Sequence, residues 1–346
     1  MDTISQFALG AAVGAAVVGR RVGLARAALW GGVCGIAPDL DAFIDYGDPV
    51  SNMTQHRAET HALFWQTLAS PPIAGALAWL HRARARPRDA FPGWLLAVWL
   101  VLVTHALLDA TTIYGTQLGL PFTNHPYGLG SIFIIDPLYT LPLIAGLVLA
   151  ARSGSPGRLR WNAAGLALSS AYLAWSAIAQ WGVQEIVARD LAARGDPPPA
   201  RVLVTPAPFN TLLWRVLVMR ESSYDEGYYA LADRGRPIRF ERFALDPELL
   251  AQGRAVPALA RIAWFSHGFF KVEDRGGVVV VSDLRMGTEP AYSFEFAVAT
   301  RASTMRPIVP VSVGGLRGVD LPASLRWIAR RIGGEDSPPP RAPRRH

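Results

Sequence analysis

The chain has 346 residues, of which 51% are hydrophobic, and its formal net charge at pH 7 is +7. A positive mean hydropathy of +0.21 is rare for a soluble protein of this size and predicts membrane segments. The basic residues are almost all arginine, with Lys271 as the single lysine, and many lie in short loops between apolar runs, so they do not indicate a nucleic-acid partner. The single cysteine, Cys34, excludes an intrachain disulfide.

Six apolar segments follow one another in the first half of the chain. They cover residues 7–19, 27–37, 62–80, 94–114, 132–151 and 161–182. The first two are short and rich in Gly and Ala, which suits a tightly packed pair or a re-entrant hairpin, whereas the last four approach the ~20 residues that span a bilayer. We therefore predict a polytopic α-helical membrane domain of about six apolar helices, the first two short. The alternative, a soluble bundle of buried helices, is disfavoured by four such long runs.

Arginines occupy alternate loops of this half. They are Arg20, Arg21 and Arg26, then Arg82, Arg84, Arg86 and Arg88, and then Arg152, Arg158 and Arg160. Because arginine and lysine are retained on the cytoplasmic side, these loops should be cytoplasmic. The other loops, 38–61 and 115–131, carry only Arg57 and should face outward. Six crossings would place the rest of the chain on that outer side as well.

The composition changes near residue 182, because residues 183–346 carry 23 of the 34 basic residues and read like a soluble domain. We expect a transmembrane metal-site domain over 1–182, a linker over 183–202, an extracytoplasmic α+β domain over 203–332 and a disordered tail over 333–346. Strand-like runs such as "GGVVVVSDL" and "YSFEFAVAT" support the α+β class.

Histidines and aspartates gather at the outward ends of the apolar segments. His105 and Asp109 are four residues apart and share one helix face. His61 opens the segment 62–80, and Asp39 and Asp41 follow the segment 27–37, so the arginine-based topology places all of them at one membrane face. Imidazole and carboxylate are ligands of zinc and other divalent ions, and ionisable groups in membrane segments need such partners. The pattern predicts a metal site made by His61, His105, Asp109 and one or both of the other aspartates.

The segment "HRAETH" supplies further candidates. His56 joins His61 only if it lies in a loop before the helix, with Thr60 as the helix N-cap. Glu59, or a free carboxylate, is a candidate general base. Arg57 is a candidate to bind a phosphate or stabilise negative charge. Alternatively, Arg57 forms an ion pair with a loop carboxylate and only anchors the loop.

These motifs together resemble the YdjM-like family of inner-membrane proteins with suspected metal-dependent hydrolase activity. The resemblance covers about residues 1–182 and rests on "PDLD", "HRAETH", "HALLDATTIYGTQ" and "GSIFIIDPLYTLPL". It implies an inner-membrane location and a divalent-metal site, with matching positions at Asp39, Asp41, His56, His61, His105 and Asp109. The chain departs from the common pattern His-Arg-Gly-Phe-Ser/Thr-His-Ser at Ala58, Glu59 and Ala62.

We therefore expect a multi-pass inner-membrane hydrolase that depends on a divalent metal, with zinc as the expected ion. Its substrate would be a phosphoester or ester in a membrane lipid or other amphiphile at the outer face, and its C-terminal domain would be periplasmic. The alternative is a transporter or envelope scaffold with a structural metal or an ion relay. The motifs of phosphohistidine lipid phosphatases and the His-Glu-x-x-His motif of metalloproteases are absent. The sequence names no partner for the C-terminal domain.

Overall fold

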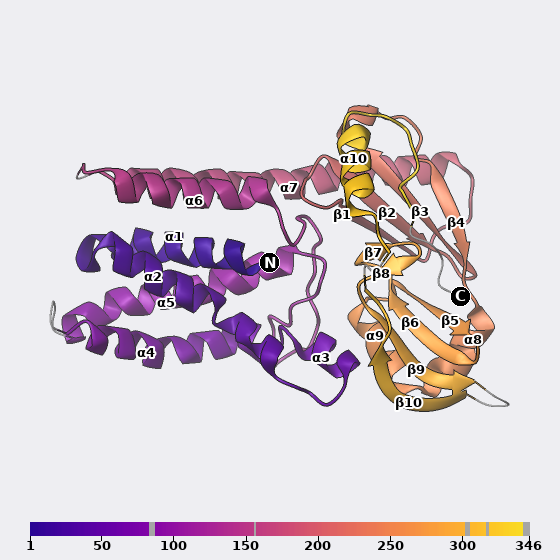
Figure 1. Cartoon of the computed structure of the whole chain (residues 1–346), viewed down its shortest axis with the longest axis horizontal. Coiled ribbons are helices and arrows are strands. Elements are labelled where there is room, and N and C mark those ends of the chain that lie inside the picture. The colour runs from indigo at the N-terminus through magenta and orange to yellow at the C-terminus, as the bar shows by residue number, and fades with distance from the viewer. Residues whose placement is uncertain (83–86, 156, 302–304, 316–317, 342–346) are drawn as a thin grey trace. The chain divides into compact units, whose positions relative to one another are not determined.

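The computed structural model describes residues 1–82, 87–155, 157–301, 305–315 and 318–341, and Figure 1 shows its course. The chain divides into two compact units. Unit 1 comprises residues 1–44, 56–177 and 208–210 and is mostly helical. Unit 2 comprises residues 45–55, 178–207 and 211 onward and is rich in β-sheet.

Unit 1 is built from helices that pack lengthwise against one another (Figure 1). Its elements are α1 (Thr3–Val22), α2 (Leu24–Ile36), the 3₁₀ turns η1 (Pro38–Phe43) and η2 (Glu59–His61), α4 (Leu63–Leu80), α5 (Pro87–Thr111), α6 (Pro137–Arg152) and the first part of α7 (Leu159–Ala193). Aspartate caps begin two of them, since Asp2 accepts hydrogen bonds from the first turn of α1 and Asp136 does so for α6.

Glycines bring α1 and α2 into backbone contact. A Cβ atom added to Gly31 would lie 2.2 Å from the carbonyl oxygen of Gly10, and one added to Gly35 would lie 2.7 Å from that of Gln6. Only glycine permits this approach, as in the small-residue contacts of membrane helices. The contact fixes the end of α2, where Gly35 lies, against the start of α1, and Asp39 follows on η1.

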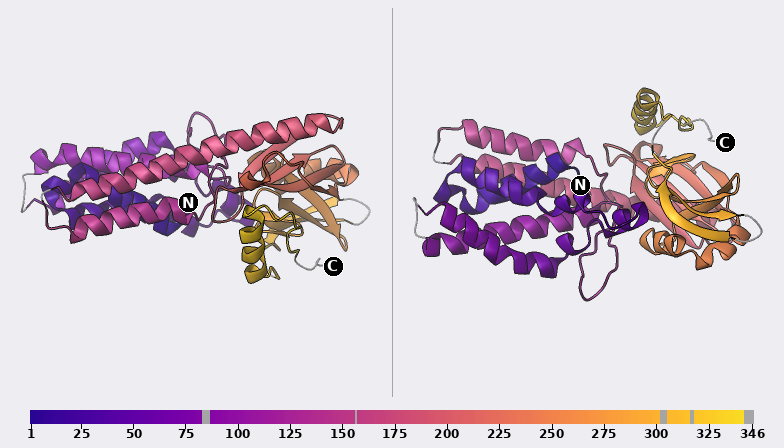
Figure 2. Two further views of the ribbon diagram at one scale, coloured as in Figure 1. Left: turned by 90° about the horizontal axis from the view of Figure 1, so that it is seen from above. Right: turned by 60° about the horizontal axis from the view of Figure 1, so that its bottom comes forward.

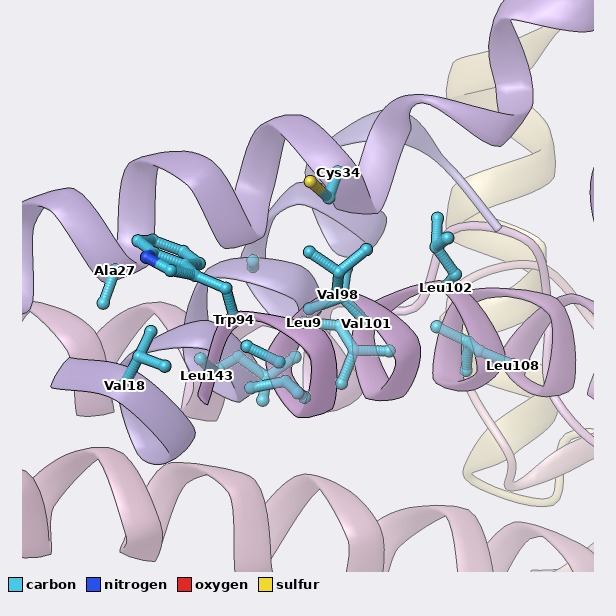
Figure 3. Close-up of a cluster of buried hydrophobic side chains, with 14 of the residues drawn as sticks. Leu9, Val18, Ala27, Cys34, Trp94, Val98, Val101, Leu102, Leu108 and Leu143 are labelled. Atoms are coloured by element: carbon cyan, nitrogen blue, oxygen red, sulfur yellow. The ribbon is translucent and has the colours of Figure 1, made fainter. Parts of the chain in front are cut away.

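The core of unit 1 lies between α1, α5 and α6. Figure 3 shows Trp94, Val98 and Val101 of α5 among the buried side chains of this cluster, with Leu9 of α1 and Leu143 of α6. All five are at most 8% exposed. This packing holds α5, which carries His105 and Asp109, in a fixed rotation against α1.

The prediction of about six apolar membrane helices is wrong. Within the described residues, two helices are long and apolar enough to cross a bilayer, Thr3–Val22 and Arg88–Thr111. The first of these was expected to be short. Helices α2 and α6, with 13 and 16 residues, are shorter than the ~20 residues that a span needs. Helices α4 and α7 contain polar residues, for example Gln66 and Asn162, and tryptophan, which lower their mean hydropathy. The prediction from the length of the apolar runs did not take these residues into account.

Unit 2 contains two four-stranded antiparallel sheets, ordered β1-β2-β3-β4 and β10-β9-β6-β5, and the small pair β7-β8. The strands of the first sheet are β1 (Arg201–Pro206), β2 (Leu213–Met219), β3 (Ser223–Ala230) and β4 (Phe240–Ala244). The others are β5 (Phe270–Arg275), β6 (Val278–Asp283), β7 (Gly287–Thr288), β8 (Ala291–Tyr292), β9 (Glu295–Arg301) and β10 (Met305–Ser312). The helices are α3 (Pro49–Gln55), α8 (Pro247–Gln252), α9 (Pro257–Phe265) and α10 (Leu321–Ile332).

The last part of α7 belongs to unit 2 and covers its first sheet (Figure 2). Val183 and Val187 of α7 are fully buried in one cluster with Val216 and Val218 of β2. An N-terminal helical region is therefore followed by a sheet-rich unit. The domain boundaries expected from the sequence remain predictions.

Candidate metal centre

Four side chains converge at the end of unit 1 where α1 begins. They are Asp39 on η1, His61 on η2, and His105 and Asp109 on α5. One ligand atom from each lies within 4.8 Å of all the others. The side chains of the two histidines and Asp109 are at most 1% exposed, whereas Asp39 is 18% exposed and forms the open side of the cluster.

The distances between these atoms match those around a small tetrahedral ion. The Nε2 atom of His61 lies 3.0 Å from Nε2 of His105, 3.3 Å from Oδ1 of Asp39 and 3.1 Å from Oδ2 of Asp109. Nε2 of His105 lies 3.6 Å and 3.5 Å from the same two oxygens. With bonds of about 2.0–2.1 Å, ligand atoms of tetrahedral zinc are about 3.3–3.4 Å apart. Four ligand atoms define six distances between them, and the five given above are near the length that a tetrahedral ion requires.

Both histidines present an Nε2 lone pair to the cluster. Nδ1 of His105 lies 2.6 Å from the carbonyl oxygen of Gly35, so Nδ1 carries the proton and donates it. Nδ1 of His61 lies 2.8 Å from the Thr60 hydroxyl, which donates its own hydrogen to Asp41 over 2.6 Å. This leaves Nδ1 of His61 as the donor. Such second contacts orient metal-binding imidazoles and set their tautomer.

Two carboxylate oxygens face the cluster, and one of them, Oδ2 of Asp109, lies 3.2 Å from Nε of Arg57. Oδ1 of Asp39 and Oδ2 of Asp109 are buried and accept no well-formed hydrogen bond from the described part of the chain. Buried carboxylate oxygens are costly without compensation, and two acceptor nitrogens at 3.0 Å add to the cost. A cation between the four atoms would satisfy all of them. The cluster could therefore hold a metal ion.

The field at the cluster also favours positive charge. Burial lowers the pKa of His61, but the carboxylates of Asp109 and Asp39 outweigh burial and leave this pKa above its usual value. The negative charge of these two carboxylates thus faces Nε2 of His61, and the guanidinium of Arg57 opposes it in part. The two carboxylates also attract a cation.

Two of the six predicted ligands lie beside the cluster. Oδ1 of Asp41 lies 2.7 Å from Nδ1 of His56, and its Oδ2 accepts hydrogen bonds from Thr60 and from the backbone N–H of Arg57. Burial raises the pKa of Asp41, but the hydrogen bonds from His56 and Thr60 outweigh it and leave the pKa below its usual value. The structure brings together the other four, and it places Asp41 and His56 as a hydrogen-bonded pair next to them.

Arg57 lies against the cluster from inside the protein. Its Nε is 3.2 Å from Oδ2 of Asp109, and its side chain is 3% exposed. One terminal nitrogen donates to the Thr112 hydroxyl over 3.3 Å, and the guanidinium lies over the ring of Tyr114 at 4.9 Å. The backbone at Arg57 has φ of 66°, a left-handed conformation that is uncommon outside glycine. This turn directs the Arg57 N–H to Asp41.

Two groups that hold Asp109 were not predicted from the sequence. The amide of Gln6 on α1 donates to Oδ1 of Asp109 over 2.9 Å, and the amino group of Met1 contacts the same oxygen. The only signal in the sequence was a glutamine, Gln6, directly before the apolar segment 7–19. The side chain of Glu59, a candidate general base, is exposed and lies outside the four-residue cluster. The prediction that Thr60 is the N-cap of α4 is wrong, because the N-cap is Ala62.

The fold and the cluster define a class: a helical membrane unit with buried histidines and aspartates that could bind a metal, followed by a sheet-rich unit. Residues 1–183 match the family described as YdjM inner membrane protein, and the chain belongs to this family. The family resemblance noted in the sequence is thereby confirmed, and with it an inner-membrane location.

Two curated relatives show partial similarity. The uncharacterized protein YfhP of Bacillus subtilis (strain 168) is 30% identical over 167 residues, which are 45% of this chain and 48% of YfhP. The thiamine transport system permease protein ThiP of Escherichia coli (strain K12) is 34% identical over 122 residues, which are 31% of this chain and 23% of ThiP. The chain thus spans about half or less of these relatives. No solved structure matches it.

Proposed function

We propose that the chain is a divalent-metal-dependent hydrolase of a phosphoester or ester in a lipid or other amphiphile. The observation that carries the proposal is the convergence of two imidazole Nε2 atoms with two carboxylate oxygens that accept no well-formed hydrogen bond from the described residues. Nitrogen and carboxylate ligands at these spacings suit zinc. A bound divalent ion would polarise a substrate oxygen and lower the pKa of water.

In this proposal the residues divide into ligands and supporting groups. Asp39, His61, His105 and Asp109 hold the ion, and the solvent-exposed edge at Asp39 admits water and substrate. The carbonyl of Gly35 fixes the tautomer of His105 that carries its proton on Nδ1, with Nε2 facing inward. Asp41 does the same for His61 through Thr60.

Proton transfer is assigned to the pair of His56 and Asp41. The Asp41 carboxylate accepts a hydrogen bond from Nδ1–H of His56 over 2.7 Å. Nε2 of His56 is then without a proton and can act as a base. The His56 side chain is 20% exposed, so water can reach it. A carboxylate-oriented imidazole is a common general base. Glu59, which is also exposed, remains the alternative base.

Arg57 places a fixed positive charge beside the cluster. Its Nε contacts Asp109, one of the four residues, so negative charge that develops on a substrate oxygen would lie close to the guanidinium. Charge stabilisation of this type accelerates hydrolysis strongly in buried sites. In the alternative role, Arg57 only neutralises Asp109.

Exposed apolar side chains next to Asp39 support an amphiphilic substrate. Leu40, Phe43 and Ile44 on or beside η1 are 58%, 86% and 51% exposed. Large apolar groups exposed together mark a contact with lipid or another apolar partner. The segment that supplies one ligand would therefore rest in the membrane surface.

The orientation in the membrane is also proposed. Helix α1 starts beside Asp109 and ends at Arg20 and Arg21, and its 20 residues correspond to about 30 Å. Because arginine-rich ends stay in the cytoplasm, the cluster would face the periplasm. The two candidate spans would make the chain multi-pass, with unit 2 in the periplasm.

The test measures metal content, melting temperature and turnover on one preparation of Arg57→Lys. We expect full metal, unchanged melting and a roughly 10²-fold lower rate on a generic phosphodiester or phospholipid, because lysine lacks the planar fork of arginine. Unchanged turnover would end the charge-stabilising role. If the wild-type protein binds metal but hydrolyses no ester, the scaffold or transporter alternative is favoured.

A further inference from the structure

A groove opens in unit 1 between the start of α2 and the end of α6. Its volume is about 590 Å³, within the range of about 300–1,000 Å³ for small-molecule sites. The walls include Ala25, Ala28, Leu147, Val148 and Ala151, and all of these are apolar. Val148 is 41% exposed, so the apolar wall is open to the surroundings. In an inner-membrane protein, an exposed apolar wall of this kind suits contact with lipid.

Two arginines complete the lining of this groove, Arg26 and Arg158. Arg26 is held in place, since its guanidinium donates to the carbonyl oxygen of Val22 over 3.3 Å. The segments 20–26 and 152–160 contain six arginines and no Asp or Glu. None of the six forms an ion pair with a carboxylate in the described part of the chain. Within the described residues, no carboxylate therefore pairs with the positive charge at the groove.

A tryptophan marks the depth of this groove in the bilayer. Trp161, at the start of α7, is 39% exposed, and Arg160 lies over its ring at 5.4 Å. Tryptophan prefers the headgroup region, where one side of the ring meets lipid and the other meets water. With Trp161 in the headgroup region, the arginines beside it would lie at the depth of the phosphate groups.

We propose that this groove binds an anionic phospholipid, with its phosphate on Arg26 and Arg158 and an acyl chain along Leu147 and Val148. Basic pockets between membrane helices bind anionic headgroups in this manner. The site is separate from the proposed hydrolase centre, because α1 connects the two over about 30 Å. The bound lipid is therefore a ligand of the helical unit and not the substrate.

The test uses the full-length protein in neutral detergent and measures the melting temperature with added phosphatidylglycerol, phosphatidylcholine or inorganic phosphate. Phosphatidylglycerol should raise the melting temperature, and the other two should not, because a ligand that binds the folded state stabilises it. An equal rise with inorganic phosphate would show a simple anion site and overturn the proposal. An equal rise with phosphatidylcholine would also overturn it.

Two variants locate the site. The double variant Arg26→Gln/Arg158→Gln should weaken phosphatidylglycerol binding on the order of 10-fold or more. Ala151→Trp should weaken it similarly by filling the groove while the charge stays constant. Arg82→Gln, an exposed arginine that stacks on Trp79 outside the groove, is the control and should bind normally. Normal binding by Ala151→Trp would indicate diffuse surface charge and refute the groove. Melting without lipid verifies that each variant is folded.

Discussion

Nδ1 of His105 lies 2.6 Å from the carbonyl oxygen of Gly35, which is 70 residues earlier in the chain. A carbonyl can only accept, so this contact leaves Nε2 of His105 without a proton and directs it toward His61. The end of α2 therefore determines which nitrogen of an α5 side chain is available to a metal.

The first prediction concerns the metal ligands. His61→Ala and His105→Ala should each lose most bound metal, because each removes one of four converging atoms. His56→Ala should retain it, since His56 pairs with Asp41 instead. Elemental analysis of the purified proteins measures this, with His125→Ala as a control on an exposed histidine. Equal metal in the His105→Ala and His125→Ala proteins would refute the centre.

The second prediction concerns Thr60. Thr60→Val removes the hydroxyl between His61 and Asp41, so His61 loses the partner that orients it. Metal affinity should fall about 10–100-fold, as is typical when a residue that hydrogen-bonds to a metal ligand is lost. Competition with a chelator measures the change. Thr67→Val, on the exposed side of α4, is the same substitution and should leave the affinity unaltered.

The third prediction concerns the contact between α1 and α2. Gly31→Ala would place Cβ 2.2 Å from the Gly10 carbonyl and force the helices apart, at a cost of about 1–3 kcal/mol or more. Gly75→Ala, on α4 with open space around it, should instead stabilise by about 0.5–1 kcal/mol. Melting temperatures should move in opposite directions. A stable Gly31→Ala protein would show that the two backbones do not touch.

The fourth prediction concerns orientation. In a Cys34→Ser background, a cysteine replacing Phe122, which is 80% exposed, should react with a membrane-impermeant thiol reagent in intact spheroplasts. A cysteine replacing Ser155, in the arginine-rich segment, should react only after permeabilisation. The reverse pattern would place the metal centre in the cytoplasm.

The fifth prediction concerns α10 in unit 2. Arg331 donates two hydrogen bonds to Asp233, of 2.7 and 2.6 Å. Burial raises the pKa of Asp233, but Arg331 and the backbone N–H of Ala230 outweigh it and leave this pKa below its usual value. The ionised carboxylate of Asp233 therefore stabilises the folded state above about pH 4. This stabilisation is lost as the pH falls through the pKa that Asp233 has in the folded protein.

Hydrogen exchange in residues 321–332, corrected for intrinsic rate, should therefore accelerate in acid. In Arg331→Gln it should already be faster at pH 7, on the order of 10-fold. The central strand β2 serves as the internal reference. Exchange in α10 that does not respond to Arg331→Gln would mean that the ion pair does not anchor the helix.

Which residues gather at the site could be predicted from the sequence more fully than the helices that surround it. The spacing of His105 and Asp109 fixes their common face, because helix geometry is local. Nothing local indicates that Gln6 reaches Asp109, since that contact depends on how α1 packs against α5. The predicted number of spans was wrong for two reasons. Helices α2 and α6 are too short, and polar residues within α4 and α7 lower their hydropathy below that of a span.

The glycine contact between α1 and α2 has a consequence for fluctuations at the metal centre. Where two helices meet through side chains, rotamer changes allow their separation to vary. Here peptide groups touch, and Gly35 belongs both to this contact and to the hydrogen bond with His105. Side-chain motion in the neighbouring core should therefore move the carbonyl that orients His105 very little. The position of Nε2 of His105 should vary little even when substitutions repack that core.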